Sequence, residues 1–192
     1  MLREKLQEYN IILASGSPRR QQFFKDLDID FSIQLKPIEE IYPKELKGAA
    51  ITDYLANLKS KAFINLAEKD VVITSDTIVW LDDKALGKPK NEEEAFAMLR
   101  SLSGKKHEVI TSISIKTKNN QQIISDVTAV TFKDLSEEEI NYYIKNYKPF
   151  DKAGAYGIQE WIGFIGIINI EGSYFNVVGL PVHKLYKAFI NL

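Results

Sequence analysis

The 192-residue sequence has no cysteine and only two histidines. The lack of cysteine excludes disulfides, thiolate metal sites and a cysteine nucleophile. His107 and His183 are too few for a multi-histidine metal site, so a bound metal would be a hard cation held by carboxylates. We interpret both histidines as structural, because neither has the spacing of a metal ligand or of a nucleophile's partner.

The sequence also has almost no net charge and no long apolar run. Its 25 Lys and Arg residues nearly balance 26 Asp and Glu residues, which gives a formal net charge of -1. No global basic field is present to attract nucleic acid, so we expect no nucleic-acid partner. Charged residues continue through Glu8, and the apolar stretch after them is too short for a signal peptide or a membrane span. We expect a cytoplasmic protein that does not bind membranes.

Hydrophobic residues make up 45% of the chain, enough for a substantial core. We find no repeat, low-complexity tract or linker, so residues 1–192 are expected to form one domain, within which two lobes could share a cleft. Predicted helices cover 18–27, 51–67, 91–102, 136–147 and a final segment from about 181. Predicted strands cover 10–14, 31–35 and 71–81, with hairpins at 109–117/121–132 and 162–170/174–178. This order indicates an α/β fold with antiparallel hairpins.

The segment from Leu13 to Arg20 has the pattern of an anion site. Ser17 is placed to cap the helix that follows, and Pro18 suits its first position. The free N–H groups of the first turn, with Arg19 and Arg20 beside them, would favour phosphate. Taken alone, the segment fits an ordinary helix cap with two solvated arginines better.

Asp76 is the strongest candidate for a catalytic carboxylate. It lies between two apolar β-branched runs, where a carboxylate needs a cation or hydrogen-bond donors nearby. Thr77 could add a hydroxyl, and Glu39 and Glu40 could supply oxygen ligands for Mg²⁺ or Mn²⁺. The alternatives are a strand-end turn residue for Asp76 and solvated loop charges for the two glutamates.

Three lysines and one glutamine could contact a nucleotide. Lys88 follows Gly87 and precedes Pro89 in a stiff loop that suits a phosphate. Lys61 could lean from the 51–67 helix into a cleft, although a surface role explains both it and Lys59 more simply. In the segment from Asp151 to Gln159, small residues allow close backbone approach, and the Gln159 amide could read a base edge. That segment could also be a plain β-turn.

These clusters together resemble the Maf family of nucleoside triphosphate pyrophosphatases over nearly the whole chain. The resemblance rests on six stretches: Leu13 to Arg20, Ser75 to Val79, Leu86 to Pro89, Leu102 to Gly104 with His107 to Thr111, Asp151 to Gln159, and Gly172 to Tyr174 with Val178 to Pro181. The form of the Asp151 to Gln159 stretch is similar to the branch that acts on dTTP and UTP. Glu160 and Trp161 depart from the pattern, because many members have glycine after the glutamine.

The resemblance implies a fold like that of inosine triphosphate pyrophosphatases: a mixed twisted sheet with flanking helices, two lobes around a deep cleft, and commonly a homodimer. It implies that Asp76 is the proton acceptor and that Arg19, Thr77 and Gln159 govern substrate choice. The implied phosphate-binding residues are Ser15, Ser17, Arg20, Lys61 and Lys88, and the implied ligands of Mg²⁺ or Mn²⁺ are Glu40 and Asp76. Water would attack the α-phosphorus of a nucleoside triphosphate and release pyrophosphate.

Two other functions fit parts of this pattern. One is a nucleotide-binding regulator of cell division without turnover, and the other is a sugar-nucleotide transferase. The combination of Asp76, Lys88 and Glu40 favours hydrolysis, because a pure sensor needs no general base.

Overall fold

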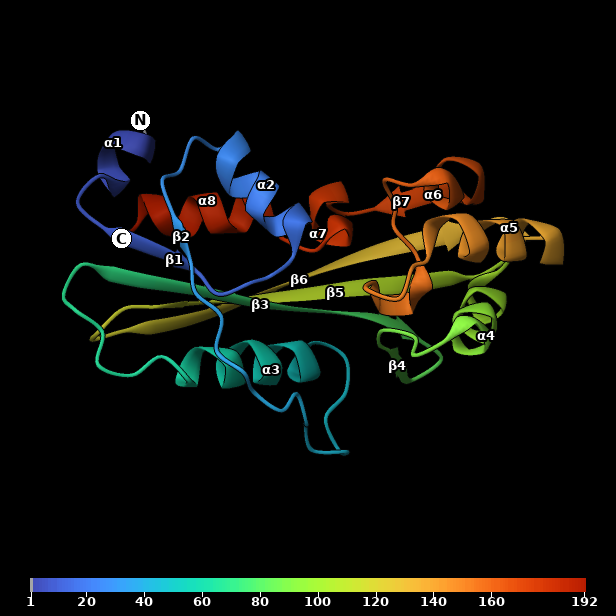
Figure 1. The fold of residues 1–192 in the computed structure, drawn as a ribbon, viewed down its shortest axis with the longest axis horizontal. Coiled ribbons are helices and arrows are strands. Elements are labelled where there is room, and N and C mark those ends of the chain that lie inside the picture. The colour runs from blue at the N-terminus through green and yellow to red at the C-terminus, as the bar shows by residue number, and fades with distance from the viewer. Residues whose placement is uncertain (1) are drawn as a thin grey trace. The chain divides into compact units, whose positions relative to one another are not determined.

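The computed structural model describes residues 2–192, which form a mixed seven-stranded sheet with flanking helices (Figure 1). The sheet order is β2-β1-β3-β5-β6-β7, and β4 pairs with β3. The strands are β1 (Asn10–Leu13), β2 (Ser32–Ile33), β3 (Asp70–Leu81), β4 (Lys84–Leu86), β5 (Lys106–Lys116), β6 (Gln121–Phe132) and β7 (Ile167–Glu171). Strand β1 runs parallel to β2 and β3, whereas β4 is antiparallel to β3 and β7 is antiparallel to β6. The expected mixed α/β fold is confirmed.

The chain divides into two compact units. Unit 1 comprises 1–76, 111–126 and 179–192, and unit 2 comprises 77–110 and 127–178. The helices of unit 1 are α1 (Leu2–Leu6), α2 (Pro18–Asp26), α3 (Ala49–Lys61) and α8 (Val182–Ile190). Those of unit 2 are α4 (Glu92–Leu102), α5 (Glu137–Tyr147), the 3₁₀ turn η1 (Ala153–Ala155), α6 (Trp161–Gly166) and α7 (Tyr174–Val178).

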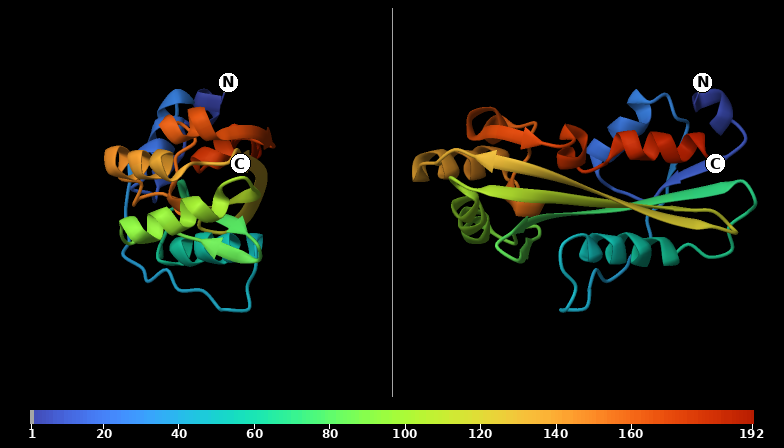
Figure 2. Two further views of the ribbon diagram at one scale, coloured as in Figure 1. Left: turned by 90° about the vertical axis from the view of Figure 1, so that its right-hand side faces the viewer. Right: turned by 180° about the vertical axis from the view of Figure 1, so that it is seen from behind.

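The core of unit 1 follows from the alternation of side chains along β1 and β3. Ile11 pairs with Val71 and Leu13 with Ile73, and these four side chains join Phe24 of α2 and Phe189 of α8 in one buried cluster. Ile12 and Val72 point to the opposite face and pack against Phe63, just after α3. Helices α1, α2 and α8 therefore cover one face of this part of the sheet and α3 covers the other (Figures 1 and 2).

Helix α3 is shorter than the 51–67 helix that the sequence predicts. It ends at Lys61, where the Lys116 ammonium donates to the carbonyls of Ser60 and Phe63 at 3.2 and 2.8 Å. A cation at the carbonyl end of a helix stabilises that end. The apolar spacing continues past Lys61 because Ala62 and Leu66 pack against the cluster around Ile12, although they lie outside the helix.

The helices α4 and α5 of unit 2 begin as predicted. The Asn91 side chain accepts from the Glu94 N–H at 2.8 Å and caps α4. Ser136 and Glu139 form the expected capping box of α5. The predicted hairpin at 109–117/121–132 corresponds to the neighbouring strands β5 and β6.

The hairpin predicted at 162–170/174–178 is wrong. Residues 161–166 form α6, and 174–178 form α7, with the strand β7 between them paired to β6. In α7, the buried Asn176 amide donates to the Val109 carbonyl and to Thr128 Oγ1, each at 3.0 Å. These tertiary hydrogen bonds hold a helix in a segment whose β-branched and aromatic residues favour a strand.

Candidate functional site

Asp76 lies within β3 and is 7% exposed. Lys59 Nζ is 2.7 Å from Asp76 Oδ1 and 3.1 Å from Glu40 Oε2, and it also donates to the Ser75 carbonyl at 3.3 Å. The cation that a buried carboxylate needs is thus supplied by α3. Two carboxylates from distant parts of the sequence meet at one ammonium group.

The register of α3 on β3 explains why Lys59 reaches Asp76. The buried Thr74 hydroxyl donates to the Ala56 carbonyl at 2.6 Å and fixes α3 against β3 two residues before Asp76. Lys59 lies three positions after the buried Ala56 and four after the buried Leu55, so it shares their helix face. Lys61 is exposed and forms no ion pair with Asp76 or Glu40, because positions two apart do not share a face.

The residue that sequence reasoning undervalued is therefore Lys59. Its spacing from Leu55 and Ala56 was the available signal, since helical periodicity places it on the buried face. From their sequence context, Lys59 and Lys61 both fit a surface role. Their surroundings differ because the rotation of α3 about its axis turns Lys59 toward β3 and leaves Lys61 exposed.

The predicted anion segment forms the turn between β1 and α2. The buried Ser15 hydroxyl accepts from the Ser17 N–H at 3.3 Å and from Arg20 Nη1 at 3.4 Å. Ser17 occupies the N-cap position and Pro18 the first turn, as predicted, but the Ser17 side chain makes no capping hydrogen bond. The first-turn N–H groups of this nine-residue helix keep the character of an anion-binding terminus.

Arg20 connects this turn to the rest of unit 1. Its Nε donates to the Gly179 carbonyl at 2.8 Å, and its Nη1 donates to the Ser75 carbonyl at 3.2 Å. Desolvation lowers the pKa of Arg20 to about 10, against the opposing effect of the Asp76 and Glu40 carboxylates. Arg20 thus remains a cation at neutral pH and fixes the backbone immediately before Asp76. Arg19 is half-buried and close enough to lower the pKa of Arg20 further.

Unit 2 carries Thr77, Lys88 and Gln159. Thr77 is half-buried and directly follows Asp76 on β3. Lys88 and Gln159 are exposed, and their loops are joined because the Gly154 N–H donates to the Gly87 carbonyl at 3.0 Å. Gly154 has a φ of 66°, and a Cβ there would lie 2.7 Å from a methyl carbon of Val79, so this junction requires glycine.

The oxygen donors around Asp76 could hold a divalent cation only together with other ligands. Within residues 2–192, no group of three or more His, Cys, Asp or Glu side chains is arranged to hold a metal ion. Asp76 and Glu40 nevertheless converge on the same ammonium group. Mg²⁺ commonly binds one or two carboxylates and takes its remaining ligands from water and substrate phosphates. The pair fits a cation of that kind, and it does not form a complete protein cage.

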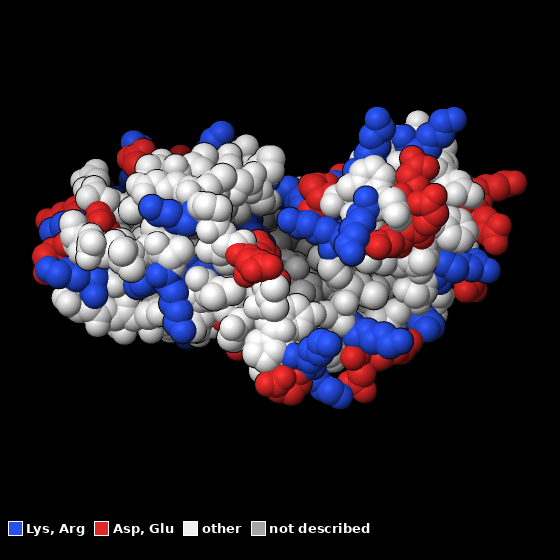
Figure 3. All heavy atoms as spheres, turned by 60° about the horizontal axis from the view of Figure 1, so that its bottom comes forward, with Lys and Arg blue, Asp and Glu red and all other residues white. Residues whose placement is uncertain are grey.

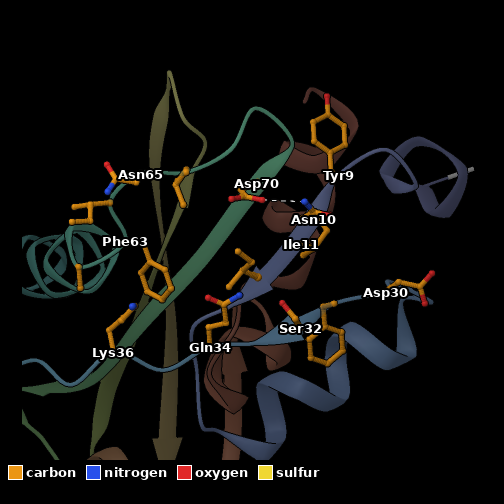
Figure 4. Close-up of a pocket in the computed structure, with 15 residues that line it drawn as sticks. Tyr9, Asn10, Ile11, Asp30, Ser32, Gln34, Lys36, Phe63, Asn65 and Asp70 are labelled. Atoms are coloured by element: carbon orange, nitrogen blue, oxygen red, sulfur yellow. Dashed lines mark hydrogen bonds between the residues drawn. The ribbon is translucent and has the colours of Figure 1, made fainter.

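A pocket of about 650 Å³ lies elsewhere in unit 1 (Figure 4). It lies at the start of β1 and β3, where the Asn10 amide donates to Asp70 Oδ1 at 3.1 Å. Lys36 Nζ lies 5.8 Å from the centre of the Phe63 ring beside it. None of the site residues predicted from the sequence lines this pocket, so it is separate from the chemistry at Asp76.

The surface of the described residues carries charges of both signs. On the face shown in Figure 3, basic and acidic side chains are interspersed. No helix in the described part of the chain is both long and apolar enough to cross a membrane.

Comparison with known proteins identifies the family. The family model described as Maf-like protein matches residues 10–192. The chain is 62% identical to a dTTP/UTP pyrophosphatase of Flavobacterium johnsoniae, with 100% of both chains covered. It is 55% identical to a dTTP/UTP pyrophosphatase of Phocaeicola vulgatus, covering 98% of this chain and 99% of that protein.

A solved structure shares the fold. A HAM1 protein from Coxiella burnetii aligns with a TM-score of 0.53 and 15% identity, covering 96% of this chain and 100% of the other. At that identity the likeness concerns the fold alone. The family match and the full-length relatives together show that this chain belongs to the Maf-like protein family.

Proposed function

We propose that this chain hydrolyses dTTP and UTP to the corresponding nucleoside monophosphate and pyrophosphate. The observation that carries the proposal is the buried Asp76 carboxylate paired with Lys59 and joined by Glu40. The full-length relatives named dTTP/UTP pyrophosphatase support the same reaction.

Asp76 is the proposed proton acceptor. A water oxygen bonds to the α-phosphorus, the bond from that phosphorus to the bridging oxygen breaks, and pyrophosphate departs with the bonding electrons. The proton lost by the water passes to Asp76. The Lys59 ammonium lies 2.7 Å from Asp76 Oδ1, so a positive charge stands beside the carboxylate that accepts the proton. General-base help of this kind contributes roughly 10²- to 10⁴-fold to the rate.

The phosphate chain is assigned to the α2 terminus and to basic side chains. The first-turn N–H groups of α2 favour an anion, and Ser15, Ser17 and Arg19 lie at or beside that turn. Arg20 acts mainly by holding this turn against the Ser75 and Gly179 carbonyls. Lys88 is a further candidate because Pro89 and the Gly87 contact to Gly154 fix its loop.

Asp76 and Glu40 are the residues that would hold Mg²⁺ or Mn²⁺ together with the triphosphate. When bound, such a cation supplies neutralisation of the charge that develops on departing pyrophosphate. Lys59 already lies against both carboxylates and contributes positive charge at the same point.

Base choice is assigned to Gln159, with Thr77 and Arg19 as further contributors. The Gln159 amide can donate to a carbonyl oxygen of uracil or thymine and accept from its N3–H. Cytosine presents an acceptor at N3, so it cannot complete this pairing. Adenine likewise presents an acceptor at ring nitrogen N1, so it cannot complete this pairing either, whereas guanine presents the same carbonyl oxygen and ring N–H as uracil. The homodimer and the cytoplasmic location expected from the sequence stay predictions.

The test is a panel of nucleoside triphosphates incubated with the purified protein and Mg²⁺ or Mn²⁺, with all products resolved. We expect dTTP and UTP to give monophosphate and pyrophosphate, and purine triphosphates to react poorly. Release of orthophosphate, or rates on GTP and ATP equal to those on dTTP and UTP, would contradict the proposal. Tight nucleotide binding with no turnover would favour the regulator.

A further inference from the structure

We propose that Glu160 is a positioning residue that presents Gln159 to the pyrimidine base. The Glu160 carboxylate contacts two side chains of unit 2, Lys152 and Tyr143. These contacts fix the turn of residues 157–160, which carries Gln159. The inference rests on the proposed function, in which Gln159 reads the base, and it names a specificity determinant of that same site.

The two carboxylate oxygens of Glu160 contact different partners. Oε1 lies 3.0 Å from Lys152 Nζ, and Oε2 accepts a hydrogen bond from the Tyr143 hydroxyl. Lys152 and Tyr143 are both buried, and Tyr143 lies on α5, a separate element from the turn. The Glu160 carboxylate thus connects the turn to α5 through Tyr143 and to the preceding loop through Lys152.

Gly157 shows how closely the turn packs on this network. Its N–H donates to the Tyr143 hydroxyl at 3.0 Å. A Cβ at this position would lie 2.9 Å from Glu160 Cδ and 3.0 Å from Lys152 Cε. The backbone therefore passes against the ion pair itself, and any shift of the Glu160 carboxylate changes the space into which residue 157 fits.

Gln159 lies between the anchored points of this turn. The Glu160 N–H donates to the Gly157 carbonyl at 3.0 Å, and Ile158 is 6% exposed. The Glu160 carbonyl accepts from the N–H groups of Gly163 and Phe164, at 2.8 and 3.2 Å, at the start of α6. Gln159 is exposed, whereas Ile158 is buried and the Glu160 backbone is hydrogen-bonded. The backbone from which the Gln159 side chain extends is therefore fixed.

A buried ion pair contributes little net stability, because desolvation offsets the attraction, but it can fix one conformation. Burial and the nearby Glu160 carboxylate raise the pKa of Tyr143, so its hydroxyl stays a donor. Lys152 also lies 2.7 Å from Asp151 Oδ1, so it keeps a partner when the Glu160 carboxylate is removed. Substitution of Glu160 should therefore disturb the turn without unfolding unit 2.

The experiment compares Glu160→Ala, Glu160→Gln and Tyr143→Phe with the wild type on UTP and CTP. For Glu160→Ala we expect the UTP-to-CTP ratio of kcat/KM to fall about 10-fold, through a higher KM for UTP with kcat within about threefold. Glu160→Gln should recover part of the ratio, because its amide oxygen can still accept from Tyr143. Tyr143→Phe should lower the ratio in the same direction.

The matched control is Glu171→Ala, which removes another lysine-paired glutamate of unit 2. Glu171 lies 2.7 Å from Lys106 Nζ, but its side chain is 57% exposed. Its ratio should equal that of the wild type. A folded Glu160→Ala protein with the wild-type ratio, or an equal fall in Glu171→Ala, would overturn the positioning role.

A double variant separates this inference from the function on which it rests. If Glu160 acts through Gln159, then Glu160→Ala should change the ratio in the wild-type background and leave it unchanged in a Gln159→Ala background. An equal effect in both backgrounds would overturn the inference. Failure of the wild-type protein to hydrolyse UTP would instead contradict the proposed function.

Discussion

Lys59 Nζ lies 2.7 Å from Asp76 Oδ1 on the neighbouring strand β3, and both side chains are largely buried. Glu40 Oε2 lies 3.1 Å from the same ammonium. Removal of the lysine would leave a buried carboxylate without this cation and close to a second negative charge. Lys59 of α3 is therefore the ammonium group that both carboxylates share.

The first prediction compares two lysines of one helix. Lys59→Ala should lower kcat/KM for dTTP by about 100-fold, because the general base loses its counter-charge. Lys61→Ala should change it by no more than about threefold, because Lys61 is exposed and forms no ion pair with Asp76 or Glu40. Pyrophosphate release under steady-state conditions measures both. Equal losses would show that the rotation of α3 does not separate their roles.

The second prediction concerns Arg20 and stability. Arg20→Met removes the donors to the Gly179 and Ser75 carbonyls, so the buried Gly179 carbonyl loses this partner, while the Ser75 carbonyl keeps only the Lys59 ammonium among these side-chain donors. The free energy of unfolding in urea should fall by about 2–4 kcal/mol. Arg3→Met is the control, because the Arg3 side chain is 62% exposed and comes no closer than 4.0 Å to the exposed Asp30 carboxylate. It should cost no more than about 0.5 kcal/mol. Similar losses in both variants would contradict a scaffolding role for Arg20.

The third prediction concerns acid and His107. Desolvation lowers the pKa of His107 from 6.5 to about 4, and its Nε2 lies 2.8 Å from the Tyr156 hydroxyl. Between these two values the unfolded chain binds more protons, so the contribution of His107 to stability is present above pH 6.5 and is lost as the pH falls toward 4. From pH 7 to pH 5 the loss should be about 2 kcal/mol.

Urea unfolding of the wild type and His107→Gln at both pH values isolates this effect. The variant should lose about 2 kcal/mol less than the wild type on going from pH 7 to pH 5, because glutamine does not titrate there. The same pH dependence in both proteins would show that His107 is not responsible.

The fourth prediction concerns base reading. Gln159→Glu removes the amide donor and adds a negative charge, so discrimination between uracil and cytosine nucleotides should weaken. The ratio of kcat/KM for UTP and CTP measures it. If that ratio does not change, Gln159 does not read the base, and Arg19 or Thr77 must do so.

Local signals predicted most of the elements. The Asn91 cap, the Ser136–Glu139 capping box and the strand before Ser15 are read from short stretches, and the structure agrees. The exceptions are set by distant contacts. Residues 174–178 are helical because Asn176 bonds to β5 and β6.

In the candidate site, too, some features follow from the local sequence and others from contacts between distant residues. Burial of Asp76 follows from its apolar neighbours on β3, which the sequence displays. Its pairing with Lys59 depends on the contact of Thr74 with Ala56, which no local pattern encodes. The role proposed for Glu160 likewise depends on its contact with Tyr143, which lies 17 residues earlier on α5.

The most direct test of the central claim is turnover and binding of dTTP by Asp76→Asn. The substitution keeps the size of the side chain but cannot accept a proton, so the rate of pyrophosphate release should fall by roughly 100-fold or more. Nucleotide affinity measured by calorimetry without divalent metal should fall far less, because the α2 terminus and Arg19, which are assigned to the phosphates, are unchanged. Near wild-type turnover in folded Asp76→Asn protein would contradict the account.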